Sequence, residues 1–196
     1  MCLIIVKETG AEFPNEDILA EAFKANPDGA GLAYNKHGHV YIHKGYMTYQ
    51  HFIECYRNVL GHITKDSALV IHFRKASRGK VNPELTHPFP ISDNLDILTK
   101  SFLKTDYAVV HNGTIKEMDK YLKKDKRKLS DTIVFVQKYL SLIANNDCWF
   151  DKDCNQQLLE LLLDDGRMCI LNNQGEIRTV GNFFKYNNLL FSKQSF

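Results

Sequence analysis

The sequence predicts an α+β fold in which antiparallel sheets are covered by helices, within a single domain that spans residues 1–196. Short apolar runs of the kind found in buried strands outnumber the helical segments. The helical segments gather in two clusters along the chain, which favours helical layers packed on sheets. Neighbouring strand-like runs are joined by turn sequences, which indicates hairpins and antiparallel pairing.

The first elements alternate between strand and helix. Residues 3–6 form a continuous apolar run, which favours a buried strand. Asn15 is a typical helix cap, and the helix that it starts is expected to end at Asn26, because a residue before proline disfavours helical geometry. Residues 31–34 and 39–43 flank a Lys-His-Gly turn and are expected to form a hairpin.

The later elements are predicted by the same criteria. Apolar residues at helical spacing predict helices over 48–60, 130–143 (capped by Ser130) and 156–163. Apolar runs predict strands over 68–73, 107–111, 167–171 and 176–180. The last two strands flank an Asn-Asn-Gln-Gly turn, so we expect a second hairpin there.

Composition excludes several classes of protein. The chain has 25 Lys and Arg against 23 Asp and Glu, with 44% hydrophobic and 24% charged residues. This is ordinary for a globular protein and excludes a collagenous, disordered or polybasic chain. No apolar stretch approaches the ~20 residues of a membrane helix, and no secretory signal pattern is present. We therefore expect a cytoplasmic protein that needs neither a membrane nor a nucleic-acid partner.

The cysteines do not indicate a metal site or a disulfide framework. Their number is odd, and no two are spaced as a CxxC pair. They are cysteines 2, 55, 148, 154 and 169. We expect reduced thiols, with Cys148 and Cys154 structural or exposed. His39 and His43 share a strand face but lack an evident third ligand, so we predict no metal and no cofactor.

Cys2 is the first candidate for a chemical role. It directly precedes residues 3–6, so a central strand is expected to hold it at the end of a sheet. Removal of Met1 would leave a thiol and a free α-amine on the same residue. An unperturbed α-amine has a pKa of about 7.7–8.0 and can act as a base near neutrality. The alternative is a small buried cysteine without a role.

The second candidate is the segment His-Phe-Arg-Lys-Ala-Ser-Arg-Gly at residues 72–79, which is followed by Thr-His-Pro-Phe at 86–89. Arg74 leaves the end of a predicted buried strand, where a guanidinium can bind a carboxylate through two parallel hydrogen bonds. The alternative is a surface arginine after a strand, with His72 as a core histidine.

Two shorter motifs follow. Asn112 and Gly113 end a predicted strand, where the Asn NH₂ and the Gly N–H can point to one place, as the donors of an oxyanion hole do. The alternative is a plain turn. Ser130 and Asp131 begin a predicted helix, where they cap it and complement its dipole. Asp131 is alternatively an anionic contact for a substrate ammonium.

The order and combination of these motifs resemble the class II glutamine amidotransferases. These N-terminal-nucleophile hydrolases include the glutaminase domains of amidophosphoribosyltransferase, glucosamine-6-phosphate synthase and asparagine synthetase. The resemblance spans residues 2 to about 132. Its motifs are Met-Cys at 1–2, Asn-Pro-Asp-Gly-Ala-Gly at 26–31, the 72–79 segment through His-Pro-Phe at 87–89, and His-Asn-Gly-Thr-Ile at 111–115. The Leu-Phe-Ser ending at 190–192 resembles the closing strand of small stand-alone members.

The resemblance implies a role for each candidate. Cys2 would be the nucleophile, with its own α-amine as the base. Arg74 would bind the α-carboxylate of glutamine, and Asp131 its α-ammonium. Asn112 and Gly113 would form the oxyanion hole. Ser77 would also belong to the substrate pocket, because it replaces a usual threonine and keeps the hydroxyl.

The resemblance also implies a four-layer αββα sandwich of two antiparallel sheets. The expected function is a glutaminase that supplies ammonia to a separate synthetase or ligase partner. Two alternatives are a non-catalytic binding or regulatory module of the same fold, and an amidohydrolase on another γ-glutamyl or N-acyl compound. The basic run at residues 123–128 is expected to be a solvated loop, with a phosphate or nucleic-acid contact as the alternative.

Overall fold

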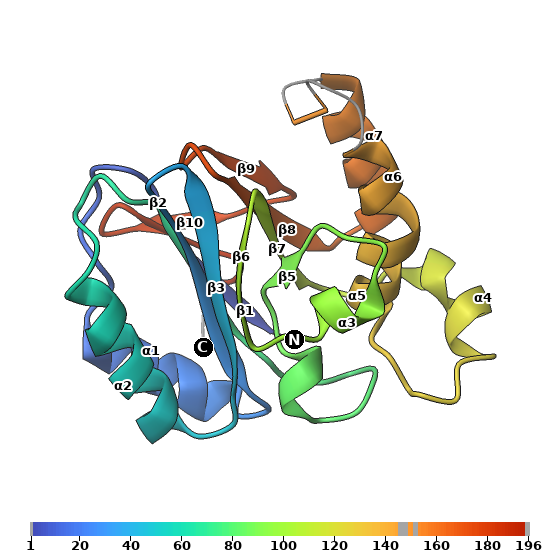
Figure 1. Cartoon of the computed structure of the whole chain (residues 1–196), viewed down its shortest axis with the longest axis horizontal. Helices are drawn as coiled ribbons and strands as arrows, with labels where there is room; N and C mark the ends of the chain where they lie inside the picture. Colours follow the sequence, from blue (N-terminus) through green and yellow to red (C-terminus); the bar gives the residue numbers. More distant parts are fainter. Residues whose placement is uncertain (1, 145–148, 151–152, 195–196) are drawn as a thin grey trace.

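A computed structural model of the chain describes residues 2–144, 149–150 and 153–194. The described residues form an α+β fold with two antiparallel sheets, of seven and four strands (Figure 1). The prediction of an α+β protein built on antiparallel sheets is thus confirmed. Cys148 and Met1 lie outside the described residues. None of the helices in the described parts of the chain has the length and apolarity to cross a bilayer.

The larger sheet contains the strand at the start of the chain near its centre. In spatial order its strands are β10 (Phe184–Tyr186), β11 (Leu189–Phe191), β1 (Leu3–Lys7), β4 (Leu69–Phe73), β2 (Ala30–Lys36), β3 (His39–Tyr46) and β6 (Phe102–Thr105). The smaller sheet orders β5 (Phe89–Pro90), β7 (Tyr107–Asn112), β8 (Arg167–Asn172) and β9 (Ile177–Val180). β1 is hydrogen-bonded on both sides, to β11 and β4.

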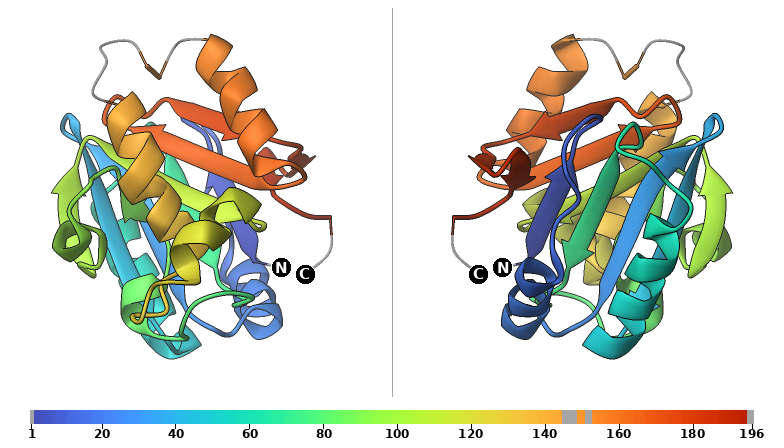
Figure 2. Two further views of the ribbon diagram at one scale, coloured as in Figure 1. Left: turned by 90° about the vertical axis from the view of Figure 1, so that its right-hand side faces the viewer. Right: turned by 90° about the vertical axis from the view of Figure 1, so that its left-hand side faces the viewer.

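The helices lie in two groups on opposite sides of the molecule (Figure 2). The first group is α1 (Glu16–Ala25) and α2 (Tyr49–Leu60). The second is α5 (Asp131–Phe135), a π-helical turn η3 (Val136–Leu140), α6 (Ser141–Ile143) and α7 (Asp153–Leu163). Short helices are η1 (Pro83–Leu85), α3 (Leu95–Leu98), η2 (Lys116–Met118) and α4 (Asp119–Leu122).

Side-chain alternation in the central strands divides the core into three apolar clusters. Leu3 and Ile5 of β1 pack with the buried faces of α1 and α2. Ile4 and Val6 point the other way and pack with Val110 and its neighbours on the smaller sheet. The opposite face of the smaller sheet packs against α5, η3 and α7. Because successive strand residues alternate between faces, β1 is buried on both sides.

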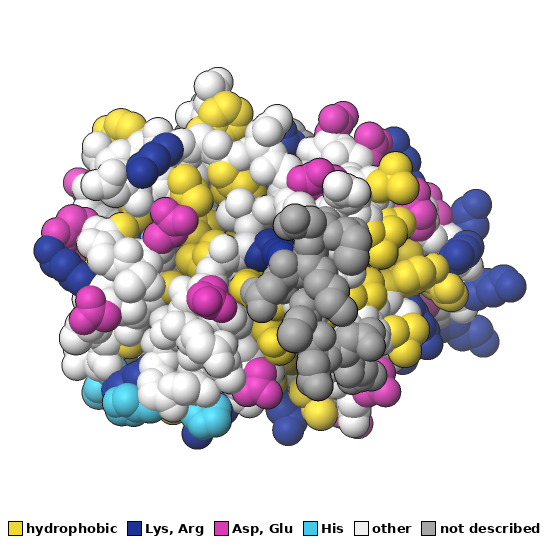
Figure 3. Space-filling view, turned by 90° about the horizontal axis from the view of Figure 1, so that it is seen from above, with side chains coloured by type: hydrophobic (Ala, Val, Ile, Leu, Met, Phe, Trp, Pro, Cys, Tyr) yellow, Lys and Arg dark blue, Asp and Glu magenta, His cyan; other side chains and the backbone are white. Residues whose placement is uncertain are grey.

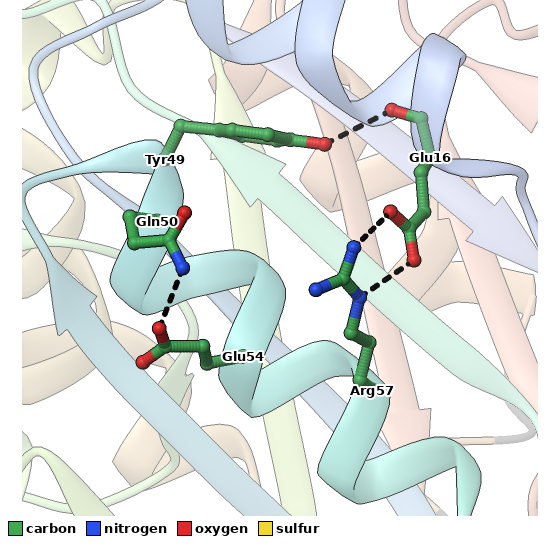
Figure 4. Close-up of polar contacts among 5 residues, drawn as sticks. All are labelled: Glu16, Tyr49, Gln50, Glu54 and Arg57. Atoms are coloured by element: carbon green, nitrogen blue, oxygen red, sulfur yellow. Dashed lines mark hydrogen bonds and ion pairs between the residues drawn. The ribbon is translucent and has the colours of Figure 1, made fainter.

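Polar contacts join α1 to α2 at the surface (Figure 4). The Arg57 guanidinium donates to both carboxylate oxygens of Glu16, at 2.8 and 2.6 Å. The Tyr49 hydroxyl donates to the Glu16 carbonyl oxygen at 3.1 Å. Exposed ion pairs contribute little free energy of folding, so the apolar face stabilises this helix pair more than these contacts do.

Local signals in the sequence locate most elements correctly. Asn15, Thr48 and Ser130 cap α1, α2 and α5 through their side-chain oxygens. The β2–β3 hairpin turns at His37 and Gly38, both with positive φ (48° and 73°), as a tight antiparallel hairpin requires. β6 and β10 were not predicted, because these short edge strands are only partly buried and lack a strong apolar pattern.

Two remaining sequence features have structural explanations. The side chain of His43 stacks on Tyr34, with ring centroids 5.9 Å apart, and contacts Phe102 at 4.7 Å. The basic run at 123–128 lies between α4 and α5, and its Lys and Arg residues are largely exposed. In the view from above, cationic side chains gather at the right-hand end of the molecule, the end that holds α4 in Figure 1 (Figure 3).

Candidate functional site

Cys2 is held at the end of the larger sheet by the strand next to it. The β1–β4 register pairs Leu3 with Phe73, so Cys2 meets the chain just beyond β4. The Lys75 N–H donates to Cys2 Sγ at 3.3 Å, and the thiol donates to the Lys75 carbonyl oxygen at 3.5 Å. Burial raises the pKa of the Cys2 thiol, while the Lys75 N–H and the Arg74 charge partly oppose that shift. The thiol therefore needs a base to become a nucleophile.

Five of the six residues singled out from the sequence line one cavity of about 30 Å³: Cys2, Arg74, Ser77, Gly113 and Asp131. We call this space the site cavity. It brings together the residue before β1, the loop after β4, the end of β7 and the start of α5. A volume of this size holds one or two water molecules. A ligand the size of an amino acid requires the walls to move.

The side chain of Arg74 is buried and already bonded. Its guanidinium donates to the carbonyl oxygens of Lys80, at 2.8 Å, and Arg78, at 3.1 Å. The loop that follows β4 therefore wraps around the Arg74 side chain. A guanidinium has five N–H donors, so a carboxylate ligand would bind the remaining donors or replace these two carbonyl oxygens, and its hydrogen bonds would be assisted by charge.

Asp28, within the Asn-Pro-Asp-Gly motif, fixes the backbone around Arg74. The Asp28 N–H donates to the Arg74 carbonyl oxygen at 3.0 Å, and the Arg74 N–H donates to the Gly29 carbonyl oxygen at 2.8 Å. The Asp28 carboxylate accepts the Ala76 N–H at 2.8 Å. The sequence alone assigned no role to this motif. The structure shows that it positions the loop after β4.

Asp131 begins α5 and is also buried. One carboxylate oxygen accepts the Ile115 N–H at 2.8 Å, and the other accepts the Thr132 N–H at 2.9 Å. Ser130 caps the helix, as expected, by accepting the Ile133 N–H. These contacts join the loop after β7 to the start of α5. The carboxylate keeps lone pairs available for a cationic ligand group.

Gly113 has a conformation that a side chain would disturb. Its φ of 147° lies outside the range that other residues adopt readily. A Cβ atom there would also lie 2.9 Å from Gly166 Cα. The tight approach of these two backbones holds Gly113 at the cavity, so the Asn-Gly pair is more than an ordinary surface turn.

Asn112 does not line the site cavity. Its side chain is fully buried, and its NH₂ donates to Ser192 Oγ at 3.0 Å. Ser192 Oγ also accepts the Ile4 N–H at 2.9 Å, and the Ser192 N–H donates to the Ile4 carbonyl oxygen at 3.0 Å. Ser192 thus joins β1 to the end of β7. The sequence predicted Ser192 only as part of a closing strand, because no local pattern predicts its contact with Asn112.

Three buried histidines, His72, His87 and His111, form a cluster, and two of them, His87 and His111, line the site cavity. His72 Nε2 is 3.2 Å from the His111 carbonyl oxygen and 2.8 Å from His87 Nδ1. A carbonyl oxygen can only accept, so Nε2 of His72 carries the proton. Burial lowers the pKa of His72 to about 3 and that of His111 to about 4, and it also lowers the pKa of His87. All three are therefore neutral near pH 7.

A second, open cleft of about 510 Å³ adjoins the site cavity and shares Cys2, Lys75, Ser77 and Gly113 with it. We call it the outer cleft. Its far wall consists of residues 163–167, which join α7 to β8, together with Thr114 and Lys116. Cys2 therefore lies between a small space and a much larger one.

The buried histidines predict a dependence of stability on pH. The unfolded chain protonates a histidine near pH 6.5, but the folded protein does not protonate His72 until about pH 3. The unfolded state then binds more protons, so the free energy of unfolding falls as the pH drops below 6.5, by up to about 1.4 kcal/mol per pH unit for one histidine. Urea unfolding at pH 7.5, 6 and 5 measures this slope.

In that experiment His72→Gln keeps an N–H donor and removes the titration, so its slope should be smaller than that of the wild type. His62→Gln is the control, because His62 is exposed and should leave the slope unchanged. Equal slopes for the wild type and His72→Gln would contradict the assignment of His72 as a neutral buried group.

Ser192→Ala should lower the free energy of unfolding by about 1–3 kcal/mol, because it leaves the Ile4 N–H and the Asn112 amide buried without their shared acceptor. Chemical denaturation followed by circular dichroism measures the change. Ser101→Ala, at an exposed serine, is the matched control. An unchanged unfolding midpoint for Ser192→Ala would show that the bridge contributes nothing.

Comparisons with known proteins do not identify a family for the chain. A scan with models of protein families finds no match to the chain. A search among curated proteins also finds no match.

Proposed function

We propose that the protein is a glutamine amidotransferase of class II, which hydrolyses the side-chain amide of glutamine through a Cys2 thioester. The observation that supports this most is the shared cavity of the Cys2 thiol, the buried Arg74–Asp131 pair of opposite charges, and Gly113. A cation and an anion beside a thiol suit an amino acid whose side chain reaches the sulfur.

We also propose the four-layer αββα arrangement of N-terminal-nucleophile hydrolases. Its support is the order of the apolar clusters. One cluster joins α1 and α2 to the larger sheet, one joins the two sheets, and one joins the smaller sheet to α5 and α7. We also propose that the ammonia passes to a separate synthetase or ligase, as the resemblance to glutamine amidotransferases implies.

The chemistry begins with proton transfer from Cys2. Because burial raises the pKa of the thiol, Sγ needs a base, and the α-amine of Cys2 would serve once Met1 is removed. The sulfur attacks the side-chain carbonyl carbon, the C–N bond breaks, and ammonia leaves with the proton. Water then hydrolyses the thioester to glutamate and restores the thiol.

The two charged groups would hold the part of glutamine that does not react. Arg74 would exchange the carbonyl oxygens of Arg78 and Lys80 for the α-carboxylate. Asp131 would accept the α-ammonium, and the Ser77 hydroxyl would line the same space. The exchange at Arg74 opens the loop after β4, which gives the cavity the room that it lacks without a ligand.

The charge that develops on the carbonyl oxygen needs two donors. The Gly113 N–H would be one. The Asn112 NH₂ would be the other, as the resemblance implies. Because it donates to Ser192 Oγ and does not line the site cavity, it would have to leave that contact and the segment at the end of β7 would have to move. Loss of one oxyanion donor typically costs ~10²–10³ in rate.

Cys2→Ala should abolish glutamate release from glutamine because it removes the nucleophile, and it should leave the fold intact because the side chain is small and lies beside the end of a strand. Cys55→Ala, at a partly exposed thiol on α2, is the control and should retain activity. A glutamine-mimicking electrophile should label Cys2, as peptide mass mapping would reveal. Wild-type activity in Cys2→Ala would remove Cys2 as the nucleophile.

Activity should also require removal of Met1, because an amide nitrogen on Cys2 has a delocalised lone pair and cannot accept a proton. Intact mass spectrometry and glutamate release would be compared for the processed chain and for a chain with a blocked N-terminal extension. Equal activity in the two forms would mean that another group is the base, with His87 and His111 of the cavity the first to test.

The non-catalytic module is the second candidate. Two observations favour it: the site cavity holds only about 30 Å³, and two N–H groups of the Arg74 guanidinium are bonded to carbonyl oxygens of the protein without a ligand. If the processed chain binds glutamine in calorimetry but releases no glutamate, even with candidate acceptors present, the binding module replaces the enzyme.

A further inference from the structure

The outer cleft is larger than the hydrolysis of free glutamine requires. If the α-carboxylate and α-ammonium occupy the site cavity at Arg74 and Asp131, the scissile carbonyl lies at Cys2 and Gly113, which line both spaces. The amide nitrogen then faces the outer cleft. Ammonia occupies little more than a water molecule, whereas the cleft measures about 510 Å³, within the range of roughly 300–1,000 Å³ for small-molecule sites.

The charges of the outer cleft favour an anion. Lys75, Lys116 and Arg167 oppose Asp164 and Asp165 along its walls, an excess of one positive charge. Lys116 pairs with Asp164 at 3.0 Å. Among the described residues, Lys75 and Arg167 have no ion-pair partner within 4.0 Å, so two cations face the single carboxylate of Asp165.

Arg167 is well placed to bind such an anion. One N–H of its guanidinium donates to the Asp165 carbonyl oxygen at 2.7 Å, which orients the group. Its backbone pairs with Asn112 across β7 and β8, so the side chain starts from the strand pair that ends at Gly113. Gly113 and Gly166 lie close together, so the turn before Arg167 lies next to the place where the scissile carbonyl would bind.

We propose that the outer cleft binds the amine portion of a substituted γ-glutamyl amide, and that this portion carries a carboxylate, as in a γ-glutamyl amino acid. This inference rests on the proposed function and names its substrate class. Cys2 Sγ attacks the γ-carbonyl carbon, the C–N bond breaks, and the amino acid leaves with the transferred proton. Water hydrolyses the thioester, so the net reaction consumes one water and yields glutamate and a free amino acid.

The test compares three compounds with the full chain after removal of Met1: L-glutamine, γ-L-glutamylglycine and γ-L-glutamylglycinamide. The last two have nearly the same shape and differ in the charge of the leaving group. Glutamate release should show kcat/KM for γ-L-glutamylglycine about tenfold above that for each of the others, because the carboxylate gains charge-assisted hydrogen bonds.

Substitutions in the outer cleft test which residues cause the preference for a leaving group with a carboxylate. Arg167→Gln and Lys75→Gln should each lower the ratio of kcat/KM between γ-L-glutamylglycine and γ-L-glutamylglycinamide toward one. Lys24→Gln removes the same charge from the exposed side of α1 and should keep the wild-type ratio. Circular dichroism checks that each variant is folded. If Arg167→Gln does not fold, the Lys75→Gln variant tests the proposal by itself.

The outcomes separate this inference from the function on which it rests. Hydrolysis of glutamine with a wild-type ratio near one, or with glutamine as the best substrate, overturns the assignment of the cleft and leaves the glutaminase proposal intact. A preference for γ-L-glutamylglycine that neither cleft variant reduces also overturns it. No glutamate from any of the three compounds overturns both proposals.

Discussion

The antiparallel pairing of β1 with β4 is the constraint on which the candidate site depends. Its register sets Leu3 opposite Phe73, so Cys2 and Arg74 emerge together from the same end of the sheet. A slip by one residue would turn every side chain of β1 to the opposite face. Such a slip is costly because β1 is buried on both faces, between the helices and the smaller sheet. Core packing therefore fixes the position of the thiol.

The polar groups around Cys2 are buried, and most of their hydrogen bonds are made within the protein. Arg74 binds carbonyl oxygens of its own loop, and Asp131 accepts backbone N–H groups. The buried histidines nearby stay neutral because burial disfavours the charged imidazolium. Such groups are stable without a ligand only if they are paired, so ligand binding would exchange internal contacts for new ones.

The two spaces beside Cys2 would recognise different parts of the substrate. The site cavity contains the buried charges that suit the α-carboxylate and α-ammonium of an amino acid, while the outer cleft is larger and most of its charged residues are exposed. Gly113 and Gly166 approach each other so closely that the wall between β7 and β8 admits no side chain at Gly113. Recognition in the cavity would require the loop after β4 to move. Selectivity for the leaving group would come from exposed residues of the outer cleft, which can be substituted without disturbing the core.

The sequence by itself determined the local elements: the caps at Asn15 and Ser130, the hairpin at His37–Gly38, and the continuous apolar run that is buried as β1. It also singled out five of the residues that line the site cavity. These features depend on hydrogen bonds and dihedral angles within a few residues. Only the tertiary structure decided that Ser192 holds Asn112, that the 78–80 loop binds Arg74, and that a second cleft adjoins Cys2. Asn112 and Ser192 are 80 residues apart, and no local periodicity encodes a contact that the packing of two sheets creates.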